Sequence, residues 1–459
     1  MYLTITEAAA ALRAGETTSV ELTTAAYAAA DAHDEALGVY LARFDETALA
    51  AAAKADAELA GGVDRGPLHG IPLGIKDIIA TEEGETTAQS LVLDRAWGAG
   101  GDAPVVARLR AAGAIVTGKT STMEYAIGTP DPDKPFPIPR NPWNTEHYPG
   151  GSSSGTGSGV AAGLFLGGLG TDTGGSIRYP ATSCGITGLK QTFGRVPKAG
   201  CVPLGYSYDH IGPMARSAED CALMLAVLAG HDTGDATSVD RPVDDYTGGL
   251  TGSLAGLRIG IDRLLDRSPL TAPELDPALD AAVAELTAAG AEVVDVRLPL
   301  YDELKTATML GLSAEAYAYH QPDLRSRWTD YGAGTRMAVA TGALISAGDY
   351  VQAQRVRRVG QRQVAALFAD VDLILTPTSA CGAPEVDKLT LDKIVDALHT
   401  PYWNALGNPA MSVPMGFTAD GLPLGLQIVG KPFDEATVLA AGYAYQQRTS
   451  WHRHVPPLS

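Results

Sequence analysis

Cysteine is scarce in this sequence, and the few residues present form no pattern. The 459 residues include four cysteines, at positions 184, 201, 221 and 381, without any C-x-x-C spacing. A chain of this length with so few cysteines cannot be a disulfide scaffold, so we expect thiols in a reducing compartment. The nine histidines show no H-x-x-x-H spacing, and His452 and His454 lie near the end of the chain. We therefore expect no metal site.

Long apolar runs are also missing, and basic residues are few. The longest apolar stretch, Val160 to Leu169, is well short of the ~20 residues that span a membrane, and the N-terminus has no basic flank ahead of an apolar core. Lysine and arginine number 34 against 53 aspartates and glutamates, a net charge of −19. Such a chain repels phosphate backbones and anionic lipids. We expect a cytoplasmic protein that binds neither nucleic acid nor membrane.

Helix and strand patterns alternate along most of the chain. Residues 5 to 60 are rich in alanine, leucine and glutamate, and two capping boxes, Thr4 with Glu7 and Thr18 with Glu21, predict successive helices. Short β-branched runs at 71–79, 114–118, 256–262, 291–299 and 371–377 predict strands, and helices are predicted at 103–113, 273–289 and 348–369. This alternation favours an α/β fold. The polar stretch 231–256 is either a surface loop or a domain boundary.

Two short motifs match known patterns without the structural context that those patterns need. Residues 113–120 read GAIVTGKT, the phosphate-loop expression, but the interior of the motif is itself the expected strand. Residues 151–155 read GSSSG, the nucleophile-elbow expression, but the preceding NTEHYPG is polar and contains a proline. We reject both interpretations and expect Lys119 to have a structural or rim position.

A longer constellation explains the serine- and glycine-rich segment. Residues 149–190 read PGGSSSGTGSGVAAGLFLGGLGTDTGGSIRYPATSCGITGLK, which resembles the signature sequence of the amidase signature family. Supporting segments are GIPLGIKDI, NPWNTE, NALGNPAMSVPMGF and GLPLGLQIVG. The resemblance implies an α/β/α sandwich with a large mixed central β-sheet covered by helices. It also implies one domain over residues 1–459, with a helical segment at about 1–60 and the signature core at about 70–215.

The same resemblance implies a catalytic triad. It places a lysine at Lys76, a bridging serine in a cis peptide at Ser152 and the nucleophile at Ser176. A serine hydroxyl needs an adjacent base, and a lysine can act as one when burial lowers its pKa towards ~7–8. Lys76 lies among apolar residues, which fits this requirement.

Further residues around the nucleophile receive roles from the resemblance. The backbone amides of Thr173, Gly174, Gly175 and Ser176 are implied as donors to the oxyanion. Three supporting side chains are expected to hold the loop or the lysine: Ser153, Asp172 and Arg178.

Substrate-binding residues are less well determined. We expect the pocket to be lined by loops at 123–136, 206–210, 314–328 and 402–405, with four aromatic candidates: Tyr125, Tyr206, Tyr317 and Trp403.

These residues lead to one main prediction of function and two alternatives. The main prediction is an amidase that hydrolyses the C–N bond of a linear carboxylic amide through an acyl-enzyme, with ester- or carbamate-cleaving (urethanase) side activity. It would act on small molecules as a monomer or homodimer, without cofactor, nucleic acid or membrane. The first alternative is the glutaminase-type A subunit of a tRNA-dependent amidotransferase, and the second is a non-catalytic binding protein on an amidase core.

Overall fold

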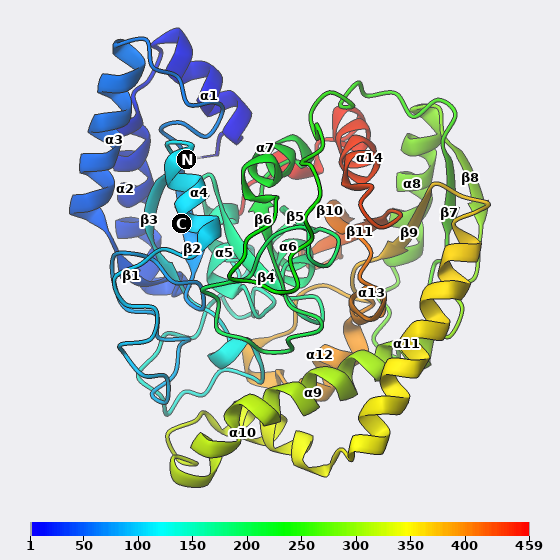
Figure 1. Ribbon diagram of the computed structural model, residues 1–459. Helices are drawn as coiled ribbons and strands as arrows, with labels where there is room; N and C mark the ends of the chain where they lie inside the picture. The colour runs from blue at the N-terminus through cyan, green and yellow to red at the C-terminus, as the bar shows by residue number, and fades with distance from the viewer. Residues whose placement is uncertain (1, 459) are drawn as a thin grey trace.

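A mixed β-sheet forms the centre of the protein (Figure 1), whose computed structural model describes residues 2–458. The described residues contribute eleven strands in the order β1-β3-β2-β4-β6-β5-β10-β11-β9-β7-β8. The strands are β1 (Tyr40–Arg43), β2 (Pro72–Lys76), β3 (Ile115–Thr120), β4 (Gly167–Asp172), β5 (Thr187–Lys190), β6 (His210–Ala215), β7 (Arg258–Ile261), β8 (Glu292–Asp295), β9 (Leu373–Pro377), β10 (Ala410–Phe417) and β11 (Pro423–Val429).

Helices cover this sheet. The α-helices are α1 (Ile5–Ala14), α2 (Ser19–Leu37), α3 (Asp45–Ala60), α4 (Pro104–Ala111), α5 (Ser154–Ala162), α6 (Arg178–Cys184), α7 (Ala218–Leu228), α8 (Leu275–Ala288), α9 (Tyr301–Ser326), α10 (Ala333–Ala340), α11 (Ala347–Leu367), α12 (Leu391–Ala397), α13 (Pro401–Leu406) and α14 (Glu435–Arg448). Strands β2, β4 and β11 are buried along their whole length, which requires cover on both faces. The predicted sandwich with a large mixed sheet is confirmed.

The N-terminal helices begin where their capping residues predict. In α1 the Thr4 hydroxyl accepts from the Glu7 amide while the Glu7 carboxylate accepts from the Thr4 amide, and Thr18 and Glu21 form the same pair at α2. The prediction of helices alone up to residue 60 missed β1, a strand of four residues. A strand this short is fixed by pairing with β3 rather than by its own sequence.

The segment that matches the phosphate-loop expression forms a strand, as its apolar interior predicts. Residues 115–120 form β3, and the Lys119 side chain is buried. Its ammonium group donates to the Ile79 carbonyl at 2.5 Å and to the Thr86 hydroxyl at 2.8 Å, and lies 3.4 Å from the Asp77 carboxylate. Lys119 is therefore a structural residue that fixes the chain leaving β2.

Two segments expected as pocket loops are helical. Residues 314–326 belong to the long helix α9, and residues 402–405 lie within α13. Helix α9 has no clean apolar stripe because α10, α11 and α13 pack against it. The stretch 231–256 contains neither helix nor strand, and the strands before and after it, β6 and β7, belong to the same sheet.

Candidate active site

The parallel strands β2 and β4 bring together Lys76 and residues 173–177, the loop that carries Ser176. We call this loop the nucleophile loop after the expected role of Ser176. They are neighbours in the sheet, with Ile75 opposite Leu169. Lys76 is the last residue of β2, and the segment from Thr171 to Ser176 begins at the end of β4. Since the carboxyl ends of parallel strands meet at one edge of a sheet, the two segments converge there.

The Lys76 amine is enclosed by hydroxyl groups. Its side chain has no exposed surface. The Nζ atom lies 2.8 Å from the Ser152 Oγ, 3.0 Å from the Ser153 Oγ and 2.7 Å from the Thr171 Oγ1. Burial lowers the pKa of Lys76 to about 7, although Cys201, Asp172 and Asp209 act in the opposite direction. Near neutral pH this amine therefore exists in both protonation states.

The two serines lie in adjacent backbone segments. The Gly151–Ser152 peptide bond is cis. The Ser153 amide donates to the Ser176 carbonyl oxygen at 3.2 Å, which ties the segment of Ser152 to that of Ser176. Ser152 is buried, Ser176 is partly exposed, and both line one pocket. Within residues 2–458 the Ser176 hydroxyl has no hydrogen-bond partner, so its oxygen is open to the pocket.

The loop before the nucleophile presents unpaired backbone amides. Gly174, Gly175 and Ser176 lie outside helices and strands, and their N–H groups donate to no other residue of the described chain. Unpaired backbone N–H groups next to a serine are of the kind that can stabilise an oxyanion.

Side chains on both sides hold this loop in place. The Thr173 hydroxyl donates to the Asp209 carboxylate at 2.6 Å, and the Thr400 hydroxyl donates to the Gly174 carbonyl at 2.8 Å. Gly175 has φ +134°, and a Cβ atom there would collide with the Thr400 side chain. Position 175 therefore requires glycine both for its backbone conformation and for space.

Asp172 and Arg178 form a buried ion pair below the loop. Arg178 donates to the Asp172 carboxylate from Nη2 at 2.9 Å and from Nε at 3.0 Å. Neither side chain has exposed surface. Burial alone would raise the pKa of Asp172, but Arg178 holds it well below its usual range. The Ile177 amide also donates to Asp172, so the pair fixes the backbone that follows Ser176.

The pocket at Ser176 has a volume of about 490 Å³ and mostly apolar walls. Its walls come from the 123–128 segment, α9, α10 and α12, with Met123, Met309, Leu312, Ile394 and Leu398 among the lining residues. Of the predicted loops, the 123–136 segment alone contributes to this lining.

The structure does not bring the four predicted aromatic residues to this pocket. Tyr125 packs against His320, with ring centroids 4.4 Å apart, and Trp403 is fully buried beside Tyr402. Tyr317 packs on the edge of the main core, and Tyr206 lines a different cavity.

Several residues of the site were given no role by the sequence. Thr171 lies within the signature and Asp209 within the predicted loop 206–210, yet neither was expected to contact the lysine or the loop of Ser176. Thr400, which holds the Gly174 carbonyl, lies outside every predicted segment. The pocket walls on α9 and α12 were missed because those segments lie far along the chain from the signature. In residues 2–458 no three His, Cys, Asp or Glu side chains cluster as a metal site, and none of the helices described is long and apolar enough to cross a bilayer.

Comparison with known proteins gives the family. A family description, Amidase, matches residues 21–439. A protein named as the A subunit of glutamyl-tRNA(Gln) amidotransferase, from Roseiflexus sp. (strain RS-1), is 42% identical over 99% of this chain and 98% of its own.

Solved structures with the same fold are also similar in sequence. One, described as a vestigial protein complex that reveals the origins of an s-triazine catabolic enzyme, is 31% identical, has a TM-score of 0.90 and covers 100% of both chains. The peptide amidase from Stenotrophomonas maltophilia is 32% identical with a TM-score of 0.85, covering 99% of this chain and 98% of its own.

These relatives contradict the prediction about partners. We expected a monomer or homodimer that acts on a small molecule with no link to nucleic acid, yet relatives about 40% identical over nearly their full length are named as one subunit of an enzyme that has a tRNA in its name. The prediction failed because net charge is an average over the whole surface, and it does not report which other subunits a chain works with.

The family follows from the match over residues 21–439 and from relatives that are similar over nearly the whole chain. This chain belongs to the amidase family, among the enzymes that carry the amidase signature.

Proposed function

We propose that this chain hydrolyses the C–N bond of a carboxamide at Ser176 and does so as the A subunit of an amidotransferase of the glutamyl-tRNA(Gln) type. The observation that carries the chemistry is the 2.8 Å contact between the Lys76 amine and the Ser152 hydroxyl, beside the open hydroxyl of Ser176. The role within a larger enzyme is supported by relatives of that name at about 40% identity over nearly the whole chain. A cytoplasmic location belongs to the same proposal.

The proposed reaction has two halves. Neutral Lys76 takes a proton from Ser152, which takes one from Ser176, and the Ser176 oxygen attacks the amide carbon. The amides of Gly174, Gly175 and Ser176 stabilise the oxyanion, each donor contributing ~2.7–4 kcal/mol. The proton returns through Ser152 to the leaving nitrogen, and an acyl-enzyme remains. Water then attacks the ester by the same relay and releases the acid.

A second candidate is hydrolysis of an amide with an apolar acyl group. The pocket walls are apolar, and its lining includes no lysine or arginine from the described residues, while the ionisable side chains there are Asp392 and Asp396. The α-carboxylate of free glutamine would find no cation in this pocket, whereas an aliphatic or aryl acyl chain would be buried.

One assay separates the two candidates. Ammonia release from glutamine and from an apolar primary amide such as hexanamide is measured for the chain with its co-purified partners and for the isolated chain. The amidotransferase proposal expects glutamine hydrolysis in the complex and little without it. The second candidate expects faster turnover of hexanamide in both samples.

The control variants test the chemistry itself. Ser176→Ala should lower either activity at least a thousandfold because the nucleophile is lost. Ser253→Ala, at an exposed serine distant in sequence from the site, should leave it within twofold. Unchanged turnover by Ser176→Ala would overturn the proposed mechanism.

A further inference from the structure

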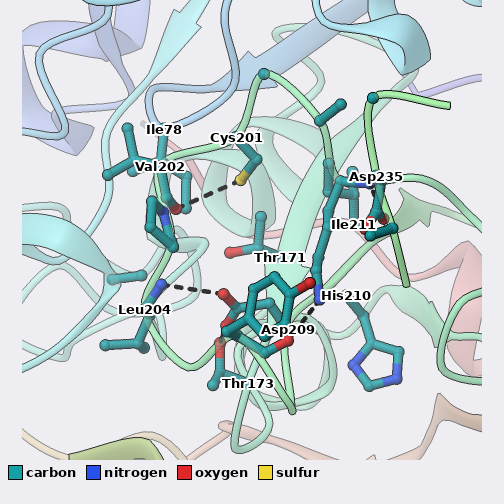
Figure 2. A pocket seen from close by; sticks show the side chains of 18 residues that line it. Ile78, Thr171, Thr173, Cys201, Val202, Leu204, Asp209, His210, Ile211 and Asp235 are labelled. Atoms are coloured by element: carbon teal, nitrogen blue, oxygen red, sulfur yellow. Dashed lines mark hydrogen bonds between the residues drawn. The ribbon is translucent and has the colours of Figure 1, made fainter. Parts of the chain in front are cut away.

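A second cavity, shown in Figure 2, has lining residues in common with the pocket at Ser176. It has a volume of about 330 Å³ and is lined by Ile78, Thr171, Thr173, Cys201, Asp209 and Ile211, among others; we call it the threonine cavity. Ala126 and Leu204 line both this cavity and the substrate pocket, so the two are neighbours with a common wall. Ala236 and Tyr206 line the threonine cavity and are solvent-exposed, so it reaches the surface.

The hydrogen bonds around Lys76 single out one of its three partners. An ammonium group has three N–H donors, and these match the hydroxyls of Ser152, Ser153 and Thr171. The Ser153 hydroxyl also donates to the Thr171 carbonyl at 3.2 Å, so its proton is committed. The proposed relay assigns the Ser152 hydroxyl to proton exchange with Ser176. Within residues 2–458 the Thr171 hydroxyl has no partner other than Lys76, and Thr171 lines the cavity.

The proposed reaction leaves Lys76 charged after every turnover. Deacylation forms a carboxylic acid next to the relay, and a carboxyl group ordinarily has a pKa of about 4. The pKa of Lys76 is about 7, so the acid gives its proton to Lys76 through the two serines and departs as a carboxylate. The next attack on substrate needs the neutral amine. When substrate fills the pocket in front of Ser152, the proton on Lys76 must leave by a route that avoids this pocket.

We propose that Thr171 passes the proton of Lys76 to water in the threonine cavity, which serves as the proton exit of the buried base. In this step one N–H bond of Lys76 breaks as a bond forms to the Thr171 oxygen, and the original Thr171 hydroxyl proton moves to a cavity water. Lys76 becomes an amine, Thr171 is unchanged, and the hydronium ion gives its proton to bulk buffer. At ~30 Å³ per molecule the cavity has room for about ten waters.

The ionisable side chains near Thr171 do not accept the proton that it passes on. The Asp209 carboxylate already accepts from the Thr173 hydroxyl and from the amides of Leu204 and Gly205. Asp172 is paired with Arg178. The His210 ring is turned to the Tyr208 carbonyl at 2.6 Å and towards Lys190 at 3.5 Å. Burial raises the pKa of the Cys201 thiol to about 12, which keeps it neutral. The Asp235 carboxylate, which also lines the cavity, already accepts from the Lys198 amide and from the amide and hydroxyl of Thr237. Water is therefore the acceptor in the proposed step.

The test separates acylation from turnover, and it rests on the proposed role of Lys76. Labelling of Ser176 by a fluorophosphonate at pH 9 starts from the neutral amine and needs no discharge of Lys76. Steady-state hydrolysis of a chromogenic ester or amide at the same pH requires Lys76 to lose its proton in every turnover. Thr171→Val keeps the shape of the side chain and removes the hydroxyl. We expect its kcat to fall at least tenfold while its labelling rate stays within twofold of wild type.

Four further variants make the outcome decisive. Thr171→Ser should keep both rates near wild type. Ala236→Phe, which narrows the exposed end of the cavity without touching Lys76, should lower kcat and leave labelling unchanged, and Ala32→Phe on the exposed surface of α2 is its control. Equal losses of labelling and kcat in Thr171→Val, or no loss in either, would overturn the proposal. Fast labelling of Lys76→Ala would instead overturn the proposed function.

Discussion

Lys76 combines complete burial with three hydroxyl partners and no carboxylate among its hydrogen bonds. The nearest negative charges, those of Asp172 and Asp209, act on it without a hydrogen bond. Burial therefore outweighs attraction, and the amine titrates near neutral pH rather than near 10.5. The motif identified this lysine from its sequence alone. Thr171 could not be identified in the same way, because its contact with Lys76 exists only once β2 and β4 are paired.

The pH profile of kcat/KM should report this amine. In the proposed mechanism the neutral form of Lys76 is the active base, and its pKa is about 7, so the rate should rise through pH 7 and level off above pH 8. At pH 6 about one tenth of the molecules hold the neutral amine, so the rate should be about tenfold below the plateau. Measurement of kcat/KM from pH 5 to 10 checks this. A profile that is flat from pH 5 to 8 contradicts the role of Lys76 as base.

The loop between β4 and α6 is the element on which the proposed chemistry depends. It leaves the sheet after Asp172, turns through Gly174 and Gly175, and enters α6 at Arg178. Its conformation is set by Thr400 and Asp209, which come from distant segments, and its glycines are signals that the sequence displays. Helix α9, which lines the pocket, lacked such a signal because its burial comes from the neighbouring helices α10, α11 and α13 rather than from an apolar stripe of its own.

A Cβ atom at position 175 should disturb this loop. Gly175→Ala introduces a collision with Thr400 and moves the unpaired amides, so we expect kcat to fall by about 10²–10³, the loss typical of one oxyanion donor. Gly15→Ala is the matched control, because Gly15 also has positive φ, at +67°, but has open space around it. It should cost about 1 kcal/mol of stability and leave kcat within twofold. Equal kcat losses in both variants would refute the steric argument.

Across the whole molecule, Arg178 joins segments that are far apart in the chain. It donates to Asp172 on β4, to Asn404 on α13 at 2.6 Å and to Gln427 on β11 at 2.6 Å. The same sheet takes strands from residue 40 to residue 429. On this basis we propose that residues 1–459 fold as one domain.

Removal of Arg178 should destabilise the whole protein. Arg178→Met leaves the buried Asp172 carboxylate without its cation, so we expect the free energy of unfolding to fall by about 3–5 kcal/mol. The double variant Arg178→Met/Asp172→Asn removes the unpaired charge and should lose less. Urea unfolding followed by circular dichroism measures both variants. A loss below about 1 kcal/mol in the single variant would show that the pair does not hold the fold together.

The strand order also determines when the sheet can form during synthesis on the ribosome. Strands β10 and β11 come near the end of the chain yet lie in the sheet between β5 and β9. During synthesis the first half of the sheet and the β7-β8-β9 portion therefore stay unconnected until residue 429 has left the ribosome. Asn404 and Gln427, which hold Arg178, and Thr400, which holds the nucleophile loop, emerge in this last stretch. A nascent chain that already contains Lys76, Ser152 and Ser176 thus lacks the contacts that organise them, and the proposed hydrolytic site is assembled only after residue 429 has emerged.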